Sequence, residues 1–248
     1  NSNQKIGLVG LGQMGSAMAQ RILHTGFDLT VYNRTASAAN KFLALGAKVA
    51  IDLPTLARSV DVIFTVVADS PDVESVILGR HGLLEGAHAN TLIVECSTID
   101  PQVSEEVGLK MRKAGFRMMD APIGGRPAQA EQGKLIFMVG ALPEDLELAR
   151  AALSALSSNI IHCGGPGMGI SMKVINNLMS QSIQLMDLEA MALGIKAGLD
   201  PQVMLDVLTS TAADNAPLRT RIPQSVLTGL YPAGFSAKLA HKDQGLAH

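Results

Sequence analysis

The stretch that decides the fold reads KIGLVGLGQMG, from Lys5 to Gly15. Its apolar run at residues 5–9 predicts a buried strand, and the amphipathic segment at residues 16–25 predicts a helix. A second apolar run follows at residues 28–32. A strand, a G-x-G-x-x-G turn, a helix and a second strand form a βαβ unit with parallel strands. The start of the chain therefore predicts an α/β fold.

The same alternation continues as far as residue 164. Short apolar runs without polar alternation are typical of strands that are buried on both faces in a parallel sheet covered by helices. Such runs lie at residues 60–67, 92–96, 116–120, 135–139 and 159–163. Helices are expected at residues 36–45, 101–113 and 144–156. We therefore expect residues 1–164 to form a doubly wound parallel sheet of the Rossmann type.

The pattern changes after Gly164. Residues 165–248 contain no convincing strand. Helices are expected at residues 170–197, 201–210, 217–228 and 236–248. We expect a smaller all-α domain, joined to the first through its long helix and serving substrate binding and oligomerisation.

Composition excludes several classes of protein. The chain has 248 residues, of which 47% are apolar and 17% charged, with a formal net charge of −2. This composition excludes a disordered chain. The sequence has no basic stripe of the kind that a nucleic-acid binder needs, and it contains no apolar run long enough for a membrane span. Cys96 and Cys163 each end a strand-like run and are expected to be buried, reduced thiols, while the histidines form no metal-binding pair. With no apolar signal segment at the start, a cytoplasmic protein without metal is predicted.

Each glycine of the turn has its own physical reason. Gly10 permits the tight turn, Gly12 lets a pyrophosphate approach the backbone, and Gly15 lets helix and strand pack closely. The N-terminus of the following helix offers N–H groups and a partial positive charge to the phosphates. We expect Gln13 and Met14 to join the three glycines in binding a dinucleotide.

The end of the second strand indicates which dinucleotide binds. An acidic residue there would accept a hydrogen bond from the 2′-hydroxyl of NAD and repel a 2′-phosphate. Here the segment is Asn33-Arg34-Thr35, which has no acidic residue and offers a guanidinium to a phosphate. NADP(H) is favoured over NAD(H). In the alternative, Arg34 is a solvated loop residue and NAD binds.

Four stretches together resemble the β-hydroxyacid dehydrogenases, a family that includes 3-hydroxyisobutyrate dehydrogenase. They are residues 6–19, 120–125, 167–177 and 234–243, so the resemblance covers nearly the whole chain. It implies an oxidoreductase that transfers a hydride between a nicotinamide and a small acidic semialdehyde or β-hydroxy acid, as a homodimer or homotetramer. Because family members usually continue for further helices, an incomplete helical domain is also expected.

Within the family, residues 164–180 most resemble the sulfolactaldehyde reductases. In the pattern of those enzymes an arginine stands where this chain has Gly125, and here Arg126 comes one position later. A guanidinium suits a carboxylate and a sulfonate equally, so 3-hydroxyisobutyrate, succinate semialdehyde and glyoxylate stay open as substrate types.

The resemblance makes Lys173 the catalytic acid. Asn176, Asn177 and Ser180 follow it at three, four and seven residues, so all four share one face of the long helix. A proton is needed by the alkoxide that develops as hydride reaches the carbonyl carbon, and Lys173 is expected to donate it. Asn177 is expected to hold the substrate oxygen or the lysine in line, and Asn176 and Ser180 to contact the substrate.

Further site residues are implied by the resemblance. The expected neighbours of the cofactor are Val67, Ala68, Thr98 and Lys242. The expected contacts of the substrate are Ser97, Gly124, Gly125 and Arg126. A second class of function, a dinucleotide-binding module without catalysis, would be favoured if the lysine were lost, and its presence favours an enzyme.

Overall fold

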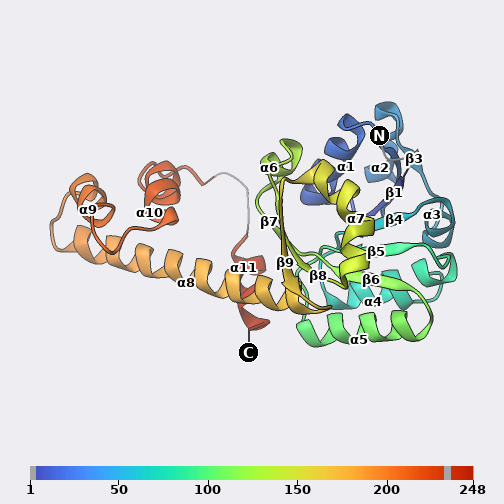
Figure 1. Cartoon of the computed structure of the whole chain (residues 1–248). Helices are drawn as coiled ribbons and strands as arrows, with labels where there is room; N and C mark the ends of the chain where they lie inside the picture. Colours follow the sequence, from blue (N-terminus) through green and yellow to red (C-terminus); the bar gives the residue numbers. More distant parts are fainter. Residues whose placement is uncertain (1–3, 232–235, 248) are drawn as a thin grey trace. The chain divides into compact units, whose positions relative to one another are not determined.

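The computed structural model describes residues 4–231 and 236–247. The chain divides into two compact units, Asn1–Lys173 and Val174–His248. Among the described residues, every strand belongs to the first unit and the second is helical. The first unit runs from blue to yellow in Figure 1, and the second from orange to red.

Six parallel strands form the main part of the sheet in the first unit. In spatial order they are β3 (Lys48–Val49), β2 (Asp28–Tyr32), β1 (Lys5–Val9), β4 (Val62–Thr65), β5 (Leu92–Glu95) and β6 (Arg117–Asp120). This 3-2-1-4-5-6 order is that of the doubly wound dinucleotide-binding fold. The predicted Rossmann-type fold class is confirmed.

The other end of the sheet departs from the expected parallel arrangement. β7 (Ile123–Gly124) and β8 (Ile136–Gly140) pair antiparallel, and β9 (Asn159–Gly164) runs parallel to β8. Because β9 pairs with β8 alone among the described strands, much of it is exposed. The expectation of burial is therefore wrong for Cys163, which is half-buried, whereas Cys96 is buried.

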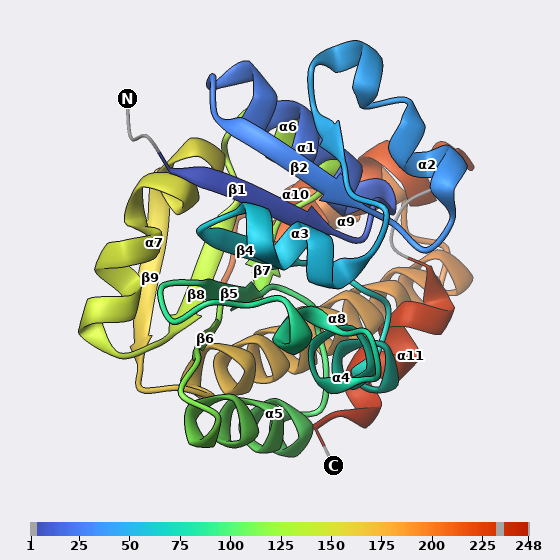
Figure 2. The ribbon, with the colours of Figure 1, turned by 90° about the vertical axis from the view of Figure 1, so that its right-hand side faces the viewer.

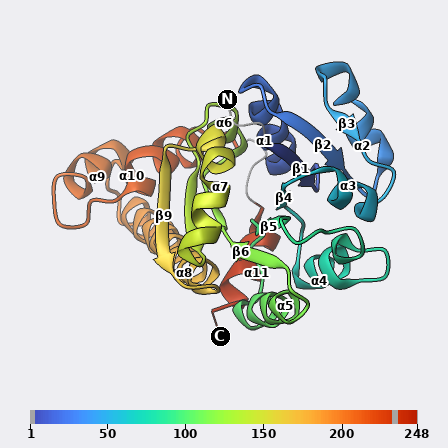
Figure 3. The same cartoon turned by 45° about the vertical axis from the view of Figure 1, so that its right-hand side comes forward.

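Helices cover both faces of the sheet (Figures 2 and 3). One face carries α1 (Gln13–His24), α6 (Pro127–Glu131) and α7 (Pro143–Leu156), and the opposite face carries α3 (Leu53–Ser59), α4 (Ser70–Leu78) and α5 (Pro101–Lys113). Each face has its own core of fully buried side chains. Leu8, Met18, Phe64, Phe137 and Leu153 belong to the first core, and Leu56, Ile63, Ile77, Ile93 and Met111 to the second.

Several predicted elements of the first unit have different bounds in the structure. The helix expected at residues 36–45 is broken into α2 (Ala36–Asn40) and a 3₁₀ turn, η1 (Leu43–Leu45). Gly46 ends that turn at a φ of 94°, a conformation that a β-carbon disfavours. The strand expected at residues 60–67 is only β4, because both ends of the run turn into loops at the edges of the sheet.

The second unit is built around α8 (Met168–Lys196), whose first residues belong to the first unit. It continues with α9 (Pro201–Leu208), α10 (Ala216–Arg221), a π-helical turn η3 (Ile222–Val226) and α11 (Ala237–Gly245). A small core joins α8, α9, α10 and η3. Its members are Met191, Met204, Leu205, Leu218 and Ile222. In the described parts of the chain, no helix combines the length and apolarity that crossing a membrane requires.

Candidate active site

The glycines of the turn between β1 and α1 serve two different purposes. A β-carbon on Gly10, whose φ is 95°, would lie 2.1 Å from the carbonyl oxygen of Val66. A β-carbon on Gly15 would lie 1.9 Å from the carbonyl oxygen of Gly10, so the close approach of helix and strand requires both glycines. A β-carbon on Gly12 would meet nothing within 4 Å. The fold therefore needs Gly10 and Gly15, whereas Gly12 opens a space above the helix.

That space adjoins the N-terminus of α1. Gly12 is the N-cap, no side chain caps the helix, and its first turn contains no acidic residue. The first N–H groups of an α-helix have no partner within the helix, and they attract anions. Gln13 is exposed and Met14 half-buried beside this end. The turn therefore fits the pyrophosphate of a dinucleotide.

Asn33 links the end of β2 to the glycine turn. Its Oδ1 accepts a hydrogen bond from the Leu11 N–H at 2.8 Å, and its Nδ2 donates to the carbonyl oxygen of Thr35 at 3.0 Å. The side chain of Arg34 is 89% exposed, and its Nη1 lies 3.4 Å from Oδ1 of Asp72, on α4. Sequence reasoning missed this carboxylate because 38 residues separate it from Arg34.

Lys41 is a further cation near the glycine turn that sequence reasoning missed. Its Nζ donates to the hydroxyl of Ser16 at 3.3 Å and lies 5.1 Å from the centre of the Phe42 ring. Ser16 belongs to the first turns of α1. An exposed ammonium group therefore stands beside the helix end that faces the open space.

A buried carboxylate, Glu95, joins the ends of β4 and β5. It accepts hydrogen bonds from the Thr65 hydroxyl and, at 2.5 Å, from the Ser97 N–H. The Ser97 hydroxyl oxygen in turn accepts from the Val67 N–H at 2.9 Å. Burial raises the pKa of Glu95 from 4.5 to about 7, against the lowering effect of these bonds, and Asp120 raises it further. Sequence reasoning missed Glu95 because it lies within an apolar run.

Several predicted residues lie at the same edge of the sheet as the glycine turn. Strand register places the end of β1 beside the end of β4, and the end of β4 beside that of β5. Val67 and Ala68 follow β4, and Ser97 and Thr98 follow β5, so the structure brings these segments together. Ser97 is buried, Val67 and Thr98 are half-buried, and Ala68 is exposed. In open α/β sheets, ligands bind at this carboxyl edge.

The segment Gly124–Arg126 connects β7 to α6. Gly125 has a φ of 127°, in the region that favours glycine, and Gly124 is half-buried. Arg126 is exposed, and its backbone N–H donates to Oε1 of Gln129 at 2.8 Å. The exposed guanidinium therefore belongs to the residue directly before a short helix.

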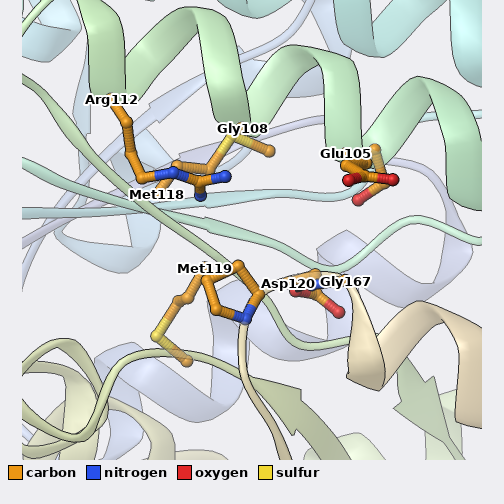
Figure 4. Close-up of a pocket in the computed structure, with 9 residues that line it drawn as sticks. Glu105, Gly108, Arg112, Met118, Met119, Asp120 and Gly167 are labelled. Carbon is orange, nitrogen blue, oxygen red and sulfur yellow. Dashed lines mark hydrogen bonds between the residues drawn. The ribbon is translucent and has the colours of Figure 1, made fainter.

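Asp120, at the end of β6, caps the N-terminus of α8. Its Oδ1 accepts from the Gly167 N–H at 2.6 Å, and its Oδ2 accepts from the Ile170 N–H at 2.8 Å. Figure 4 shows Asp120 and Gly167 facing each other. Burial raises the pKa of Asp120, while the bonds from Gly167 and Ile170 act in the opposite direction. Lys173 is half-buried and follows Ile170 by three residues.

A cavity of about 50 Å³ lies behind this contact (Figure 4). Its lining includes Gly108 and Arg112 from α5, Met118 and Asp120 from β6, and Gly167. A cavity of this size has room for a few water molecules. The candidate site is the carboxyl edge of the sheet, where the glycine turn and the segments after β4 and β5 lie.

The predicted polar residues of the second unit form one network. Asn177 Nδ2 donates to Asp243 Oδ2 at 2.8 Å, and Asn176 Nδ2 donates to Asn177 Oδ1 at 3.2 Å. Lys242 Nζ lies 3.3 Å from Asp243 Oδ1, and the Ser180 hydroxyl donates to the Asn177 carbonyl oxygen at 3.4 Å. Sequence reasoning quoted Asp243 only as part of a motif and gave it no role.

One predicted motif lies partly outside the residues that the structure describes. Gly234 and Phe235, which begin the last motif, lie outside the described residues. Over residues 4–231 and 236–247, no three histidine, cysteine or carboxylate side chains are grouped as a metal site requires.

The strand order, the glycine turn and the uncapped helix above it define a dinucleotide-binding protein. Residues 5–165 match the NAD binding domain of 6-phosphogluconate dehydrogenase. Residues 167–248 match the NAD-binding domain of NADP-dependent 3-hydroxyisobutyrate dehydrogenase. The chain belongs to this family of NAD(P)-dependent hydroxyacid dehydrogenases. The predicted family and enzyme class are confirmed.

Individual relatives agree with this assignment. The chain is 36% identical to 3-sulfolactaldehyde reductase of Escherichia coli over 242 residues, which cover 98% of this chain and 81% of the relative. It is 35% identical to NAD-dependent L-serine dehydrogenase of Pseudomonas aeruginosa over 250 residues, 98% and 84% of the two chains. The structure of Mycobacterium tuberculosis 3-hydroxyisobutyrate dehydrogenase with L-serine matches with a TM-score of 0.89 and 30% identity, covering 98% and 85%.

Proposed function

We propose that the chain reduces a small acidic semialdehyde with NADPH and that Lys173 donates the proton. The observation that carries the proposal is that the glycine turn after β1 and the start of the helix that bears Lys173, held at the end of β6, lie at the same carboxyl edge of the sheet. A bound nicotinamide supplies the hydride in this chemistry. The chain must then supply the proton, the orientation of the substrate and the charge that holds it.

Lys173 has the group that the proton transfer needs. An ammonium beside the carbonyl oxygen donates a proton as the alkoxide develops, which is general acid catalysis. Asn177 is one turn further along α8, and its amide is held by Asp243. A side chain with a fixed orientation loses little entropy when it hydrogen-bonds a substrate oxygen, which suits it to holding that oxygen in line.

Arg126 and the N–H groups of Gly124 and Gly125 are proposed to bind the acidic group of the substrate. An exposed guanidinium on a short loop forms paired, charge-assisted hydrogen bonds with a carboxylate or a sulfonate. The name of the E. coli relative contains a sulfonated aldehyde. The name of the P. aeruginosa relative contains an amino acid, which has a carboxylate. The proposed substrate is therefore defined by a short carbon chain that has an aldehyde at one end and an anion at the other.

NADPH is proposed as the preferred cofactor, with Arg34 pairing its 2′-phosphate and Thr35 supporting it. The protein is proposed to act in the cytoplasm as a homodimer or homotetramer, with residues 165–248 as the substrate-binding and oligomerisation domain. Exposed apolar side chains of the distal part of α8, such as Leu193 and Ile195, support an assembly because such surface is usually covered.

The test is turnover of sulfolactaldehyde, methylmalonate semialdehyde, succinate semialdehyde, tartronate semialdehyde and glyoxylate, each with NADPH and NADH. Lys173→Ala should lower kcat on the best substrate by about 10²–10⁴, the usual contribution of a positioned acid, and leave NADPH affinity nearly unchanged. Lys196→Ala, in the last turn of the same helix, is the matched control and should keep full activity. A kcat within a few-fold of wild type for Lys173→Ala would show that another group donates the proton.

A further inference from the structure

We propose that Asp120 is a positioning residue for Lys173. Its carboxylate holds the first turn of α8 against the end of β6, and this contact sets where Lys173 stands at the edge of the sheet. The inference rests on the proposed role of Lys173 as the acid. It assigns to Asp120 a part in the reaction that acts through the lysine and requires no contact with substrate or cofactor.

The hydrogen bonds fix the helix at two points. The Gly167 N–H binds Oδ1 at 2.6 Å and the Ile170 N–H binds Oδ2 at 2.8 Å, so the two oxygens hold two residues of the same turn. Bonds between N–H groups and a carboxylate are stronger than neutral ones, and a two-point contact restricts rotation as well as translation. Asp120 is 4% exposed, so water competes little for either oxygen.

Packing around the carboxylate is an independent sign that this contact is close. A β-carbon on Gly169 would lie 2.3 Å from the Met138 carbonyl oxygen and 2.7 Å from Asp120 Oδ2. A β-carbon on Gly140, at the end of β8, would lie 2.6 Å from the Asp120 oxygens and from the Gly169 nitrogen. Glycine at both positions is what lets helix, strand and carboxylate meet.

Lys173 is near enough to this contact to depend on it. It follows Ile170 by three residues, a rise of about 4.5 Å along the helix axis, which is less than one turn. A shift of the first turn therefore reaches Lys173 without an intervening hinge. Misplacement of a catalytic group by about 1 Å can lower a rate by about 10²-fold.

The test is a double-mutant cycle in kcat with Asp120→Asn and Lys173→Ala. Asparagine has the size of aspartate, but it can present an oxygen to only one of the two N–H groups. We expect Asp120→Asn to lower kcat by about 10- to 100-fold when Lys173 is present and by less than about threefold in the Lys173→Ala background. The Kd for NADPH, measured by fluorescence titration, should change by less than about threefold.

Two further variants separate positioning from loss of structure. Asp200→Asn removes a carboxylate that likewise accepts two backbone N–H groups, at the start of α9, and should leave kcat unchanged. Asp120→Ser keeps one oxygen acceptor on a shorter side chain and should lower kcat in the same Lys173-dependent way, which keeps the test valid if the asparagine variant folds poorly. Faster amide exchange at residues 167–170 should accompany both Asp120 variants.

The outcomes distinguish the two proposals. If Lys173→Ala alone leaves kcat within a few-fold of wild type, then the proposed function fails and the inference fails with it. If Lys173→Ala impairs turnover but the two substitutions act additively, or Asp120→Asn and Asp120→Ser leave kcat intact, then only the positioning role of Asp120 is overturned.

Discussion

Helices α1 and α8 both begin at the carboxyl edge of the same sheet, and their N-termini differ. The N-terminus of α1 has no capping side chain and no acidic residue in its first turn, and a β-carbon at Gly12 would meet open space. The N-terminus of α8 is occupied by Asp120, which accepts two of its N–H groups. Both ends attract negative charge, because the helix dipole and the unpaired N–H groups are general properties of helices.

The difference shows how one physical property serves two purposes. At α8 the anion belongs to the chain, so the helix is fixed in place before any ligand binds. At α1 the anion must come from outside, and the phosphates of a dinucleotide supply it. A helix that bears a catalytic group benefits from a permanent partner, whereas a helix that binds a cofactor needs a vacant end.

Gly12→Asp would remove the difference between the two helix ends, because it gives α1 an anion of its own. Because a β-carbon at Gly12 meets nothing within 4 Å, the variant should fold normally. Its carboxylate would occupy the place of the pyrophosphate and repel it, at a cost of several kcal/mol. We expect the Kd for NADPH to rise by about 100-fold or more.

Fluorescence titration with NADPH measures this change. Gly12→Ser, which adds similar bulk without charge, is the matched control and should weaken binding much less. Equal losses for the two variants would show that space, rather than charge, decides binding at α1.

Glu95 is, like Asp120, a carboxylate of the chain itself at the carboxyl edge of the sheet, and the cost of keeping it there can be measured. Burial raises the pKa of its carboxyl from 4.5 to about 7, so the folded chain binds more protons than the unfolded chain between these values. The free energy of unfolding should therefore fall as pH rises from about 4.5 to 7. The difference between wild type and Glu95→Gln should change by roughly 3 kcal/mol over this range, to the disadvantage of wild type at high pH.

Urea unfolding at several pH values measures this effect. Asp120, whose pKa burial also raises, is present in both proteins, so the part of its contribution that is independent of Glu95 cancels in the difference. A difference that is independent of pH would mean that Glu95 ionises in the folded chain as readily as in the unfolded one.

Arg34 gives the smallest expected effect, at the far end of the same ligand. Arg34→Ala should weaken NADPH by about 10-fold, the value of one charge-assisted contact, and weaken NADH much less. Asp72→Asn is the opposing variant, because it removes the carboxylate beside Arg34 and should strengthen NADPH by a few-fold. Competitive titration of the two nicotinamides measures both. Equal changes for NADPH and NADH would place Arg34 away from the 2′-phosphate.

Much of the fold could be predicted because buried parallel strands are written as continuous apolar runs. The bounds of β1 and β2 agree with the prediction, and so do those of α5, which Pro101 and Gly115 delimit. Helices α3 and α4 were missed although each begins with an aspartate two residues before a proline. That spacing, at Asp52 and Asp69, is a usual start of a helix and could have revealed both.

The buried acids could not be predicted in the same way. Asp120 is 47 residues from Gly167, and Glu95 is 30 residues from Thr65, so no local spacing relates the two acids to these partners. The strand pairing that brings them together is a property of the folded sheet. The one signal that the sequence provides is an acidic residue in or at the end of an apolar run, as at Glu95 and Asp120.

The contrast between the two helix ends is tested most directly by amide hydrogen exchange with and without NADPH. The amides of residues 167–170 should exchange slowly in both conditions, because Asp120 already binds two of them. The amides of residues 12–15 should exchange faster in the free protein and become protected when NADPH binds. Protection at residues 167–170 that appears only with NADPH, or no change at residues 12–15, would contradict the account.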